Sequence, residues 1–375
     1  MGQHYDIAVI GAGIAGASIA ARLAQAGKRV ALFEMESQPG YHTTGRSAAV
    51  FAPSYGPAPI RALTRASEAF FRNPPKGFCE APLFSNRKIM MLARADQSAA
   101  LEKLVASVES SKVSVISEAD ARKRNPLIRA GYTQNAMLDE AGQDIDVGAL
   151  HQGFLRMFKE AGGTLFVNAA VRSLSRADAW LINAGNSEIK SEVVVNAAGA
   201  WADKLGEMAG AETIGLTPKR RTAVMIAAPD IERLAQAPIT IDVDEQFYLK
   251  PDAGKLLISP ADETPSEPCD AQPEEIDVAI GVDRIETAFD LNVRRIESKW
   301  AGLRSFVQDK APVAGFSDVV DAFYWLAGQG GYGIQSAPAL SDFAAANILG
   351  RACPDYIESE GFSPSDVGVA RLAER

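Results

Sequence analysis

The first forty residues place the strongest constraint on the fold. A short apolar segment with β-branched residues, Tyr5 to Ile10, leads directly into the glycine pattern Gly11-Ala-Gly-Ile-Ala-Gly16. A helical pattern follows and stops at Gly27, and a second apolar segment, residues 29–33, ends in Glu34. The order of strand, glycine turn, helix, strand and acid is typical of a unit that binds a dinucleotide. It predicts an α/β fold built around a parallel sheet.

Each part of this pattern has a physical reason in a dinucleotide site. Gly11 allows the tight turn, Gly13 lets the backbone approach a pyrophosphate, and Gly16 allows the helix to pack closely on the strand. The start of the helix offers free N–H groups and a favourable dipole to phosphate. Glu34 would accept hydrogen bonds from an adenosine ribose and would repel a 2′-phosphate, which argues against NADP. A purely structural glycine turn is the alternative.

A second glycine-rich segment lies near the C-terminus. Gly328, Gly330, Gly331 and Gly333 precede a predicted helix, Ser336 to Leu349. Free N–H groups at the start of such a helix would stabilise the negative charge that a reduced flavin carries near N1 and the C2 carbonyl. A tight surface turn is again the alternative. The segment favours FAD over NAD, although the first glycine pattern alone does not distinguish the two.

Composition and charge exclude several other classes of protein. The 38 basic and 47 acidic residues give a net charge of −9, which argues against binding to nucleic acid or an anionic membrane. Three scattered cysteines and three histidines predict neither a disulfide framework nor a metal site, and they fit a reducing cytoplasm. The uncharged run from Ile7 to Ala21 is too short to span a membrane and lacks a basic flank. We therefore expect a cytoplasmic protein with no integral membrane segment.

The order of patterns along the chain predicts two interleaved domains. Residues 58–131 read mostly as helix, whereas residues 216–305 read mostly as strands and include a hairpin over residues 247–259. Because the α/β pattern returns in the middle and at the end of the chain, we predict a discontinuous Rossmann-like nucleotide-binding domain. An α+β substrate domain, built on a mostly antiparallel sheet, would be inserted in it. The predicted boundaries are residues 1–56, 140–215 and 300–375 for the first domain, and 57–139 and 216–299 for the second.

Several motifs together resemble the D-amino-acid oxidase superfamily of FAD enzymes. Within it, the likeness is greatest to the bacterial D-arginine dehydrogenase type, and it extends over nearly the whole chain. Phe78-Cys-Glu80 and Pro218-Lys-Arg-Arg221 add to its specificity. The motifs are Gly11 to Gly16, Glu34, Tyr41-His-Thr-Thr-Gly-Arg-Ser-Ala-Ala49, Val195-Asn-Ala-Ala-Gly-Ala-Trp201, Trp300-Ala-Gly-Leu-Arg304 and Gly328-Gln-Gly-Gly-Tyr-Gly-Ile-Gln335.

The resemblance implies a non-covalent FAD, because no counterpart of a flavin-linked cysteine is present. Residues 43–49 would wrap the pyrophosphate and ring, Val171 would meet the adenine through its backbone, and residues 331–335 would lie against the pyrimidine side of the flavin. Ala198 and Gly199 would let a strand end pass close to the cofactor. The complete set implied for FAD is Gly11, Gly13, Ile14, Ala15, Gly16, Glu34, Met35, Thr43, Thr44, Arg46, Ser47, Ala48, Ala49, Val171, Ala198, Gly199, Gly328, Gly330, Gly331, Tyr332, Gly333, Ile334 and Gln335.

The same resemblance implies five catalytic residues. Arg304 would grip the substrate carboxylate with two parallel hydrogen bonds, a geometry that lysine cannot copy. Arg221 would make a second contact on the carboxylate side, Tyr248 would close the pocket over the carboxylate, and Tyr55 would act as a lid. Gly331 completes the set. Taken singly, Arg221 could be a solvated strand arginine and Tyr248 an ordinary edge-strand residue.

The pocket wall departs from the arginine-preferring type. That type has a glutamate for the basic head of the substrate where this chain has Ile89, and a histidine where it has Val50. The other matching wall positions are Ile239 and Ile241. A guanidinium in such a pocket would lose its water without gaining a partner. This predicts a preference for apolar D-amino acids over D-Arg and D-Lys; Lys88 next door is better explained as a surface lysine than as a partner for an acidic side chain.

The activity implied is oxidative deamination of a D-amino acid by hydride transfer from Cα to flavin N5, giving an imine that water converts to a 2-oxo acid and ammonia. The electron acceptor, O2 or a quinone, stays open. One alternative on the same fold is oxidation of glycine-type or secondary amines, or of 2-hydroxy acids. An NAD-dependent dehydrogenase and a flavoprotein without turnover are further alternatives, the latter disfavoured because buried arginines are costly without a function.

Overall fold

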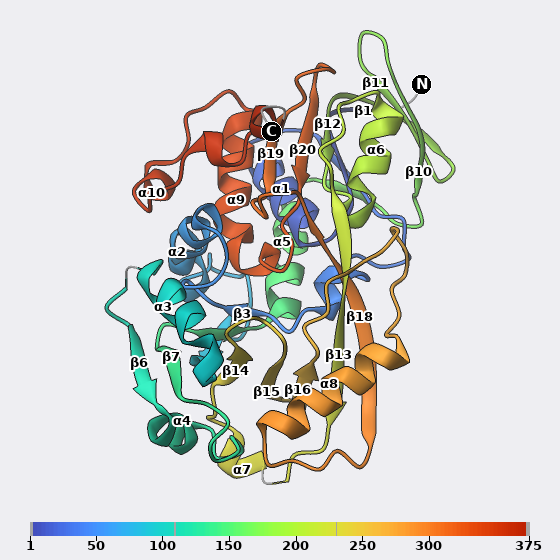
Figure 1. Cartoon of the computed structure of the whole chain (residues 1–375). Coiled ribbons are helices and arrows are strands. Elements are labelled where there is room, and N and C mark those ends of the chain that lie inside the picture. The colour runs from blue at the N-terminus through green and yellow to red at the C-terminus, as the bar shows by residue number, and fades with distance from the viewer. Residues whose placement is uncertain (1–2, 109, 230, 373–375) are drawn as a thin grey trace.

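The computed structural model describes residues 3–108, 110–229 and 231–372, which form an α/β fold with two large sheets. In Figure 1 the first sheet occupies the upper part of the molecule and the second sheet the lower part. The first sheet has the strand order β10-β11-β12-β1-β2-β9. Off this path, β20 pairs with β12 on one side and with β19 on the other. Its strands are β1 (Gln3–Ile10), β2 (Val30–Phe33), β9 (Thr164–Phe166), β10 (Val171–Arg176), β11 (Trp180–Ala184), β12 (Ser187–Asn196), β19 (Val313–Phe316) and β20 (Phe323–Ala327).

The centre of this sheet is the parallel arrangement that the glycine pattern predicts. β1 pairs in parallel with β2 on one side and with β12 on the other, and β20 joins the end of β12 in parallel. One face is covered by α1 (Ile14–Gln25), α5 (Val147–Glu160), α9 (Gly333–Ile348) and α2 (Ala58–Arg72), which share one core. α6 (Ala202–Ala209) packs on the other face through Leu205, beside Trp325.

The second sheet is mixed but mostly antiparallel, in the order β17-β13-β16-β15-β14-β5-β7-β6, with β18 paired to β13. Its parallel pair is β14 with β5. α8 (Glu275–Ala288) packs on it through Val278 and Ile285. The strands are β5 (Ile89–Ala93), β6 (Val113–Ser117), β7 (Asn135–Asp139), β13 (Thr217–Ile226), β14 (Ile239–Asp242), β15 (Tyr248–Asp252), β16 (Lys255–Ser259), β17 (Thr264–Pro265) and β18 (Ile296–Phe306).

The remaining elements are short. A third, small sheet has the strand order β3-β8-β4. These elements are β3 (Val50–Phe51), β4 (Phe84–Asn86), β8 (Gln143–Ile145), α3 (Ser98–Ala106), α4 (Glu118–Arg124), α7 (Ile231–Leu234), α10 (Asp355–Glu358), and the 3-10 helices η1 (Thr43–Arg46), η2 (Ala95–Gln97), η3 (Gly199–Trp201), η4 (Pro364–Asp366) and η5 (Val369–Leu372).

The local predictions fare unevenly. The hairpin is confirmed as β15 and β16, with Ala253 and Gly254 at φ of 46° and 77° in its turn. The prediction that residues 58–131 are mostly helical is wrong in part, because β4, β5 and β6 lie in this range. β5 is buried along its whole length, so its apolar run carries no alternation that would mark it as a strand.

Two elements near the predicted domain boundaries lie on the side opposite to the one assigned. α2, placed in the substrate domain, packs through Leu63 and Phe71 in the same core as α1 and α9. β18, whose greater part was placed in the first domain, belongs to the second sheet. The domain boundaries themselves stay a proposal.

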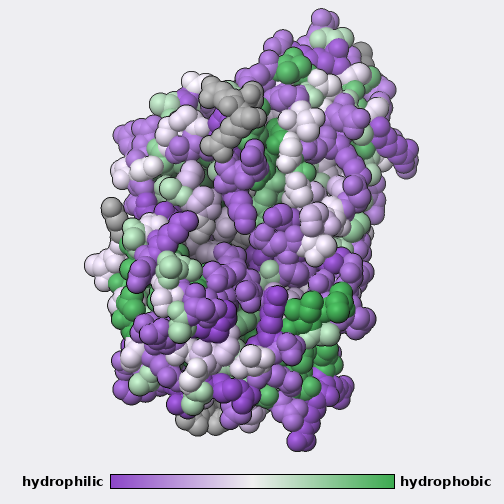
Figure 2. Space-filling model, viewed as in Figure 1, coloured by the Kyte–Doolittle hydropathy of each residue, from purple (hydrophilic) through white to green (hydrophobic). Residues whose placement is uncertain are grey.

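The surface is mixed in character. α8 carries Ile276 and Ile280 with exposed fractions of 62% and 36%. Figure 2 shows hydrophobic atoms gathered in the region of this helix and mostly hydrophilic atoms over the rest of that face. In the described part of the chain, no helix is both long and apolar enough to cross a membrane.

Candidate active site

A cavity of about 460 Å³ lies where β1, β2 and β12 end, and segments from both sheets line it. The carboxyl ends of parallel strands are where ligands bind in open α/β sheets, and the volume falls in the range of cofactor pockets. Ile10, Phe33 and Ala197 mark the three strand ends in its wall. The predicted residues that line it are Gly11, Gly13, Ile14, Ala15, Glu34, Met35, Thr43, Thr44, Arg46, Ser47, Ala48, Val171, Ala198, Gly199, Arg221, Tyr248, Arg304, Gly328, Gly330, Gly331, Gly333 and Ile334.

The glycine turn at the start of α1 leaves no room for side chains. Gly11 has a φ of +100°, and a Cβ there would lie 2.4 Å from the carbonyl oxygen of Ala197. A Cβ on Gly16 would lie 1.7 Å from the carbonyl oxygen of Gly11. Gly16 is not part of the cavity wall, so it acts as the packing glycine of the pattern. The turn therefore brings the backbone of residues 11–14 directly to the cavity.

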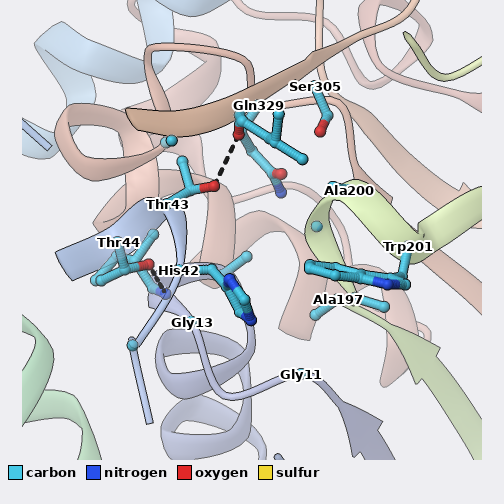
Figure 3. Close-up of a pocket in the computed structure, with 18 of the residues that line it drawn as sticks. Gly11, Gly13, His42, Thr43, Thr44, Ala197, Ala200, Trp201, Ser305 and Gln329 are labelled. Carbon is cyan, nitrogen blue, oxygen red and sulfur yellow. Dashed lines mark hydrogen bonds between the residues drawn. The ribbon is translucent and has the colours of Figure 1, made fainter. Parts of the chain in front are cut away.

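The polar groups around this turn are held by the chain itself. The Thr44 hydroxyl accepts a hydrogen bond from the Ile14 N–H at 2.9 Å, as Figure 3 shows beside Gly13. The Glu34 carboxylate, 7% exposed, accepts from the N–H groups of Ala12 at 3.1 Å and Glu36 at 3.0 Å. Glu34 thus presents an acceptor of fixed position at the end of β2.

The loop before β3 is fastened to β18. The Thr43 hydroxyl donates to the Leu303 carbonyl at 2.7 Å, and Arg46 donates to the carbonyls of Ala271 at 3.0 Å and Ala301 at 2.9 Å. These bonds hold the loop in the wall of the large cavity, between the two sheets.

A second cavity, of about 80 Å³, adjoins the first. Arg221, Tyr248, Arg304 and Gly331 line both, so these four predicted catalytic residues lie where the cavities meet. The fifth, Tyr55, lines the small cavity alone. Its wall also holds the predicted pocket residues Val50, Ile89, Ile239 and Ile241, together with Ala49 and Gln335, which were expected on the cofactor side.

The two arginines differ in how the protein satisfies them. Arg221 is 7% exposed and donates to the Asp262 carbonyl at 2.9 Å, and its Nη2 lies 3.4 Å from a Glu263 oxygen. Burial, and then the neighbouring Arg304 cation, lower the pKa of Arg221. For Arg304, within the described ranges, no hydrogen bond or ion pair is found. A Cβ on Gly331 would lie 2.8 Å from Arg304 Nη1, so the glycine is what lets the guanidinium lie there.

Sequence reasoning missed the acid of the small cavity. Glu245 lies in the turn between β14 and β15 at a φ of 56°, and its carboxylate accepts a hydrogen bond from the Tyr55 hydroxyl at 2.7 Å. Burial, and then the charge of Glu245, raise the pKa of Tyr55 well above its usual value. No motif marks Glu245 among 47 acidic residues, so its place could not be found from the sequence.

Other differences concern the large cavity. Tyr332 does not line it; its ring packs with Phe306, Ile60 and Tyr55 instead. The aromatic pair of His42 and Trp201, with ring centroids 4.9 Å apart, is part of the wall, although only the motifs containing these residues were noted. Figure 3 shows the two rings next to each other, and their planes are tilted by 53°. The residue types were visible in the motifs, but their orientation was not.

Comparison with known proteins establishes the family. Residues 6–347 match the model of the DAO family, described as FAD dependent oxidoreductase. The chain belongs to this family, and FAD is its cofactor. The residues fit FAD: the glycine turn is open to the cavity, and the buried Nε2 of Gln329, in the wall, has no partner among the described residues.

Individual relatives are distant but cover most of the chain. Glycine oxidase of Bacillus licheniformis is 25% identical over 360 residues, which cover 93% of this chain and 94% of that protein. The crystal structure of glycine oxidase from Geobacillus kaustophilus superposes with a TM-score of 0.81 at 20% identity, covering 93% and 96% of the two chains. The FAD-bound L-alpha-glycerophosphate oxidase from Mycoplasma pneumoniae gives a TM-score of 0.82 at 17% identity, covering 92% and 95%. The fold is thus shared among oxidoreductases named for different substrates.

The described residues hold neither a cluster of metal-binding side chains nor a cysteine in the wall of either cavity. No group of three or more His, Cys, Asp or Glu residues is gathered there in a way that could hold a metal ion. Cys79, Cys269 and Cys353 are free, and none of them lines either cavity.

Proposed function

We propose that the protein oxidises amino acids to 2-oxo acids and ammonia, with a preference for D-amino acids that have apolar side chains. The observation that carries the proposal is Arg304, a half-buried guanidinium at the junction of the two cavities that makes no hydrogen bond or ion pair with the described residues. An anion would stabilise a guanidinium placed there, and a carboxylate matches its geometry with two parallel hydrogen bonds. Bound FAD would supply the chemistry of the reaction, since it accepts a hydride from the substrate Cα.

The protein's own part is binding and orientation. Arg304 would hold the carboxylate, and Arg221, Tyr248 and Gly331 would complete its surroundings. Held in this way, the Cα of the substrate is fixed at the border between the small and large cavities, which is the arrangement that hydride transfer requires. Tyr55 lies over the small cavity, bonded to Glu245 at 2.7 Å, and would shield it from water.

The side-chain preference rests on the wall of the small cavity. Ile89 and Ile239 are 1% and 5% exposed, and Val50 and Ile241 lie beside them. Lys88 is not assigned to an acidic substrate side chain, because its ammonium is exposed and lies 2.6 Å from a carboxylate oxygen of Glu140. The preference for the D form rests on the resemblance to D-arginine dehydrogenases. Non-covalent FAD, an acceptor that is O2 or a quinone, and a cytoplasmic location are also proposed.

A second candidate is oxidation of glycine or a small secondary amine, and a 2-hydroxy acid would use the same carboxylate site. The volume of the small cavity, about 80 Å³, favours a small substrate such as glycine. The similarity to proteins named glycine oxidase favours it as well. This candidate uses Arg304 in the same way and differs only in what fills the small cavity.

The test is the visible spectrum of the purified protein, mixed anaerobically with single compounds. Bleaching of the flavin band by D-Leu, D-Met or D-Phe, but not by their L forms or D-Arg, supports the proposal. Bleaching by glycine or sarcosine alone supports the second candidate. Bleaching by D-Arg above all others would show the apolar-pocket argument to be wrong, and no bleaching by any amino acid would exclude the substrate class.

A further inference from the structure

Gln335, in the first turn of α9, carries a buried hydrogen-bond donor that the protein does not use. The side chain is part of the small cavity's wall, and the residue is 3% exposed. Its Oε1 accepts a hydrogen bond from the Ala52 N–H at 2.9 Å. Its Nε2 is buried and has no partner in the part of the chain that the structure describes.

The orientation of this amide follows from its neighbour. The backbone N–H of Ala52 can only donate, so the group facing it must be the amide oxygen. The NH2 group is therefore the other arm of the planar amide and points away from the Ala52 N–H. A buried N–H without an acceptor destabilises a folded protein, and native structures rarely keep one unless a ligand or water completes it. Gln335 is in this respect the counterpart of Gln329 in the large cavity.

The surroundings limit what could complete it. The other polar groups of the small cavity have assignments: the Tyr55 hydroxyl bonds to Glu245, and the arginines face the place proposed for the carboxylate. Another part of the wall, with Ile89 and Ile239, is apolar. Gln335 thus adds one neutral donor to a cavity whose wall combines these polar groups with isoleucines. Its position in the small cavity alone, away from the large one, separates it from the cofactor side.

We propose that Gln335 is a specificity-determining residue, which donates a hydrogen bond to a neutral oxygen on the substrate's side chain. The inference rests on the proposed function and revises its side-chain preference, from purely apolar side chains to neutral side chains that can accept one hydrogen bond. Side chains that carry an amide or hydroxyl oxygen are preferred over hydrocarbon side chains of the same size. The isosteric pairs that reveal this preference are D-Asn against D-Leu, and D-Thr against D-Val.

The experiment measures kcat/KM of the holoenzyme for both pairs. In the wild type, we expect a higher kcat/KM for the oxygen-bearing substrate of each pair. The hydrocarbon substrate would leave the Nε2 donor of Gln335 without an acceptor in the complex. Gln335→Glu keeps an oxygen for the Ala52 N–H but removes the donor, and Gln335→Met removes both. In each variant we expect the D-Asn to D-Leu ratio to fall about tenfold. The flavin absorption spectrum and FAD content should not change.

Ser336→Ala serves as the matched control. Ser336 is the next residue on α9, is fully buried and bonds within the helix to the Tyr332 carbonyl at 2.9 Å, outside both cavity walls. In Ser336→Ala, the ratio of kcat/KM for D-Asn to that for D-Leu should equal the wild-type ratio. The glutamate variant covers the case in which the methionine variant fails to fold, since it preserves the bond to Ala52.

Three results would overturn the inference. Equal ratios in wild type and both variants would mean that Nε2 does not contact the substrate side chain. A uniform loss for all four substrates would assign Gln335 to the loop or to the common part of the substrate. A changed flavin spectrum with unchanged ratios would place it against the cofactor. In all three cases the flavin is still bleached by amino acids, so the proposed function survives; if no amino acid bleaches it, both fall.

Discussion

The two cavities are built in opposite ways. The large one is lined by many glycine and alanine residues at strand ends and in loops, and Glu34 and Arg46 in its wall are tied by hydrogen bonds within the chain. The small one is lined by side chains from separate strands, and the buried Nε2 of Gln335 in its wall has no partner in the described part of the chain. A backbone cavity can accept the same cofactor in many relatives, whereas a side-chain cavity can change its substrate with a few substitutions. The oxidoreductases of this fold, named for different substrates, fit this division.

Gly11→Ala should have the largest effect, because it breaks the backbone cavity. The new Cβ would lie 2.4 Å from the Ala197 carbonyl oxygen at a φ of +100°, a strain of about 2 kcal/mol or more. We expect the purified variant to lose its FAD, measured as the absorbance ratio of the flavin band to protein. A variant that retains full FAD would show that the turn does not hold the cofactor.

Arg304→Met should impair the junction with the small cavity and leave the glycine turn of the large cavity intact. Removing the partner of a buried carboxylate should lower kcat/KM by on the order of a hundred- to a thousandfold. Gly331→Ala should act in the same direction but less strongly, since its Cβ would lie 2.8 Å from the guanidinium. Steady-state kinetics and FAD content are the measurements. Loss of FAD together with activity would contradict the separation of the two cavities.

Lys250→Met tests how the two regions are joined. The buried ammonium donates to the Ala48 carbonyl at 2.9 Å and to Asp144 at 2.9 Å, and so fastens β15 to the loop that lines both cavities. Its loss leaves the Asp144 charge with Arg87 alone and should lower the free energy of unfolding by about 3 kcal/mol. Urea unfolding checks this value. Lys255→Met, which removes an exposed ion pair with Glu297, is the control and should cost less than about 1 kcal/mol.

The smallest effect concerns pH. Burial lowers the pKa of His151, whose Nε2 lies 2.9 Å from the Ala12 carbonyl oxygen in the glycine turn. Because the unfolded chain binds this proton more readily than the folded one, stability is lost as the pH falls below about 6.5, the usual histidine value. We expect the urea midpoint of unfolding to decline as the pH falls below about 6.5, and to decline less in His151→Gln. An identical slope in the variant would assign the decline to other groups.

The difference between the regions also explains what the sequence could predict. Gly11, Gly13 and Glu34 follow one another within one βαβ unit, so their spacing alone indicates the large cavity. Ile89 and Ile239 are 150 positions apart in the numbering and meet only because β5 and β14 pair, and the resemblance to known enzymes was needed to bring them together. Glu245 could not be found, because its role depends on a turn that places one acid of many against Tyr55.

Gln335 shows the same limit from another side. The glycine-rich segment that contains Gln335 indicated that this residue lies near the site. The direction of its amide depends on the hydrogen bond from Ala52, which is 283 positions away in the chain. Likewise, β5 was predicted as part of a helical stretch because a strand buried on both faces carries no alternation. Local chemistry was readable in the sequence, and orientation across the fold was not.

The measurement that tests the central claim most directly is anaerobic titration of wild type and Arg304→Met, side by side, with D-leucine. Both proteins should be yellow, because the glycine turn and Glu34 of the large cavity are unchanged in the variant. The account predicts rapid bleaching of the flavin band in the wild type and little or none in the variant. Bleaching of both at the same rate would contradict it, since a carboxylate would then not be held by Arg304 at the junction of the two cavities.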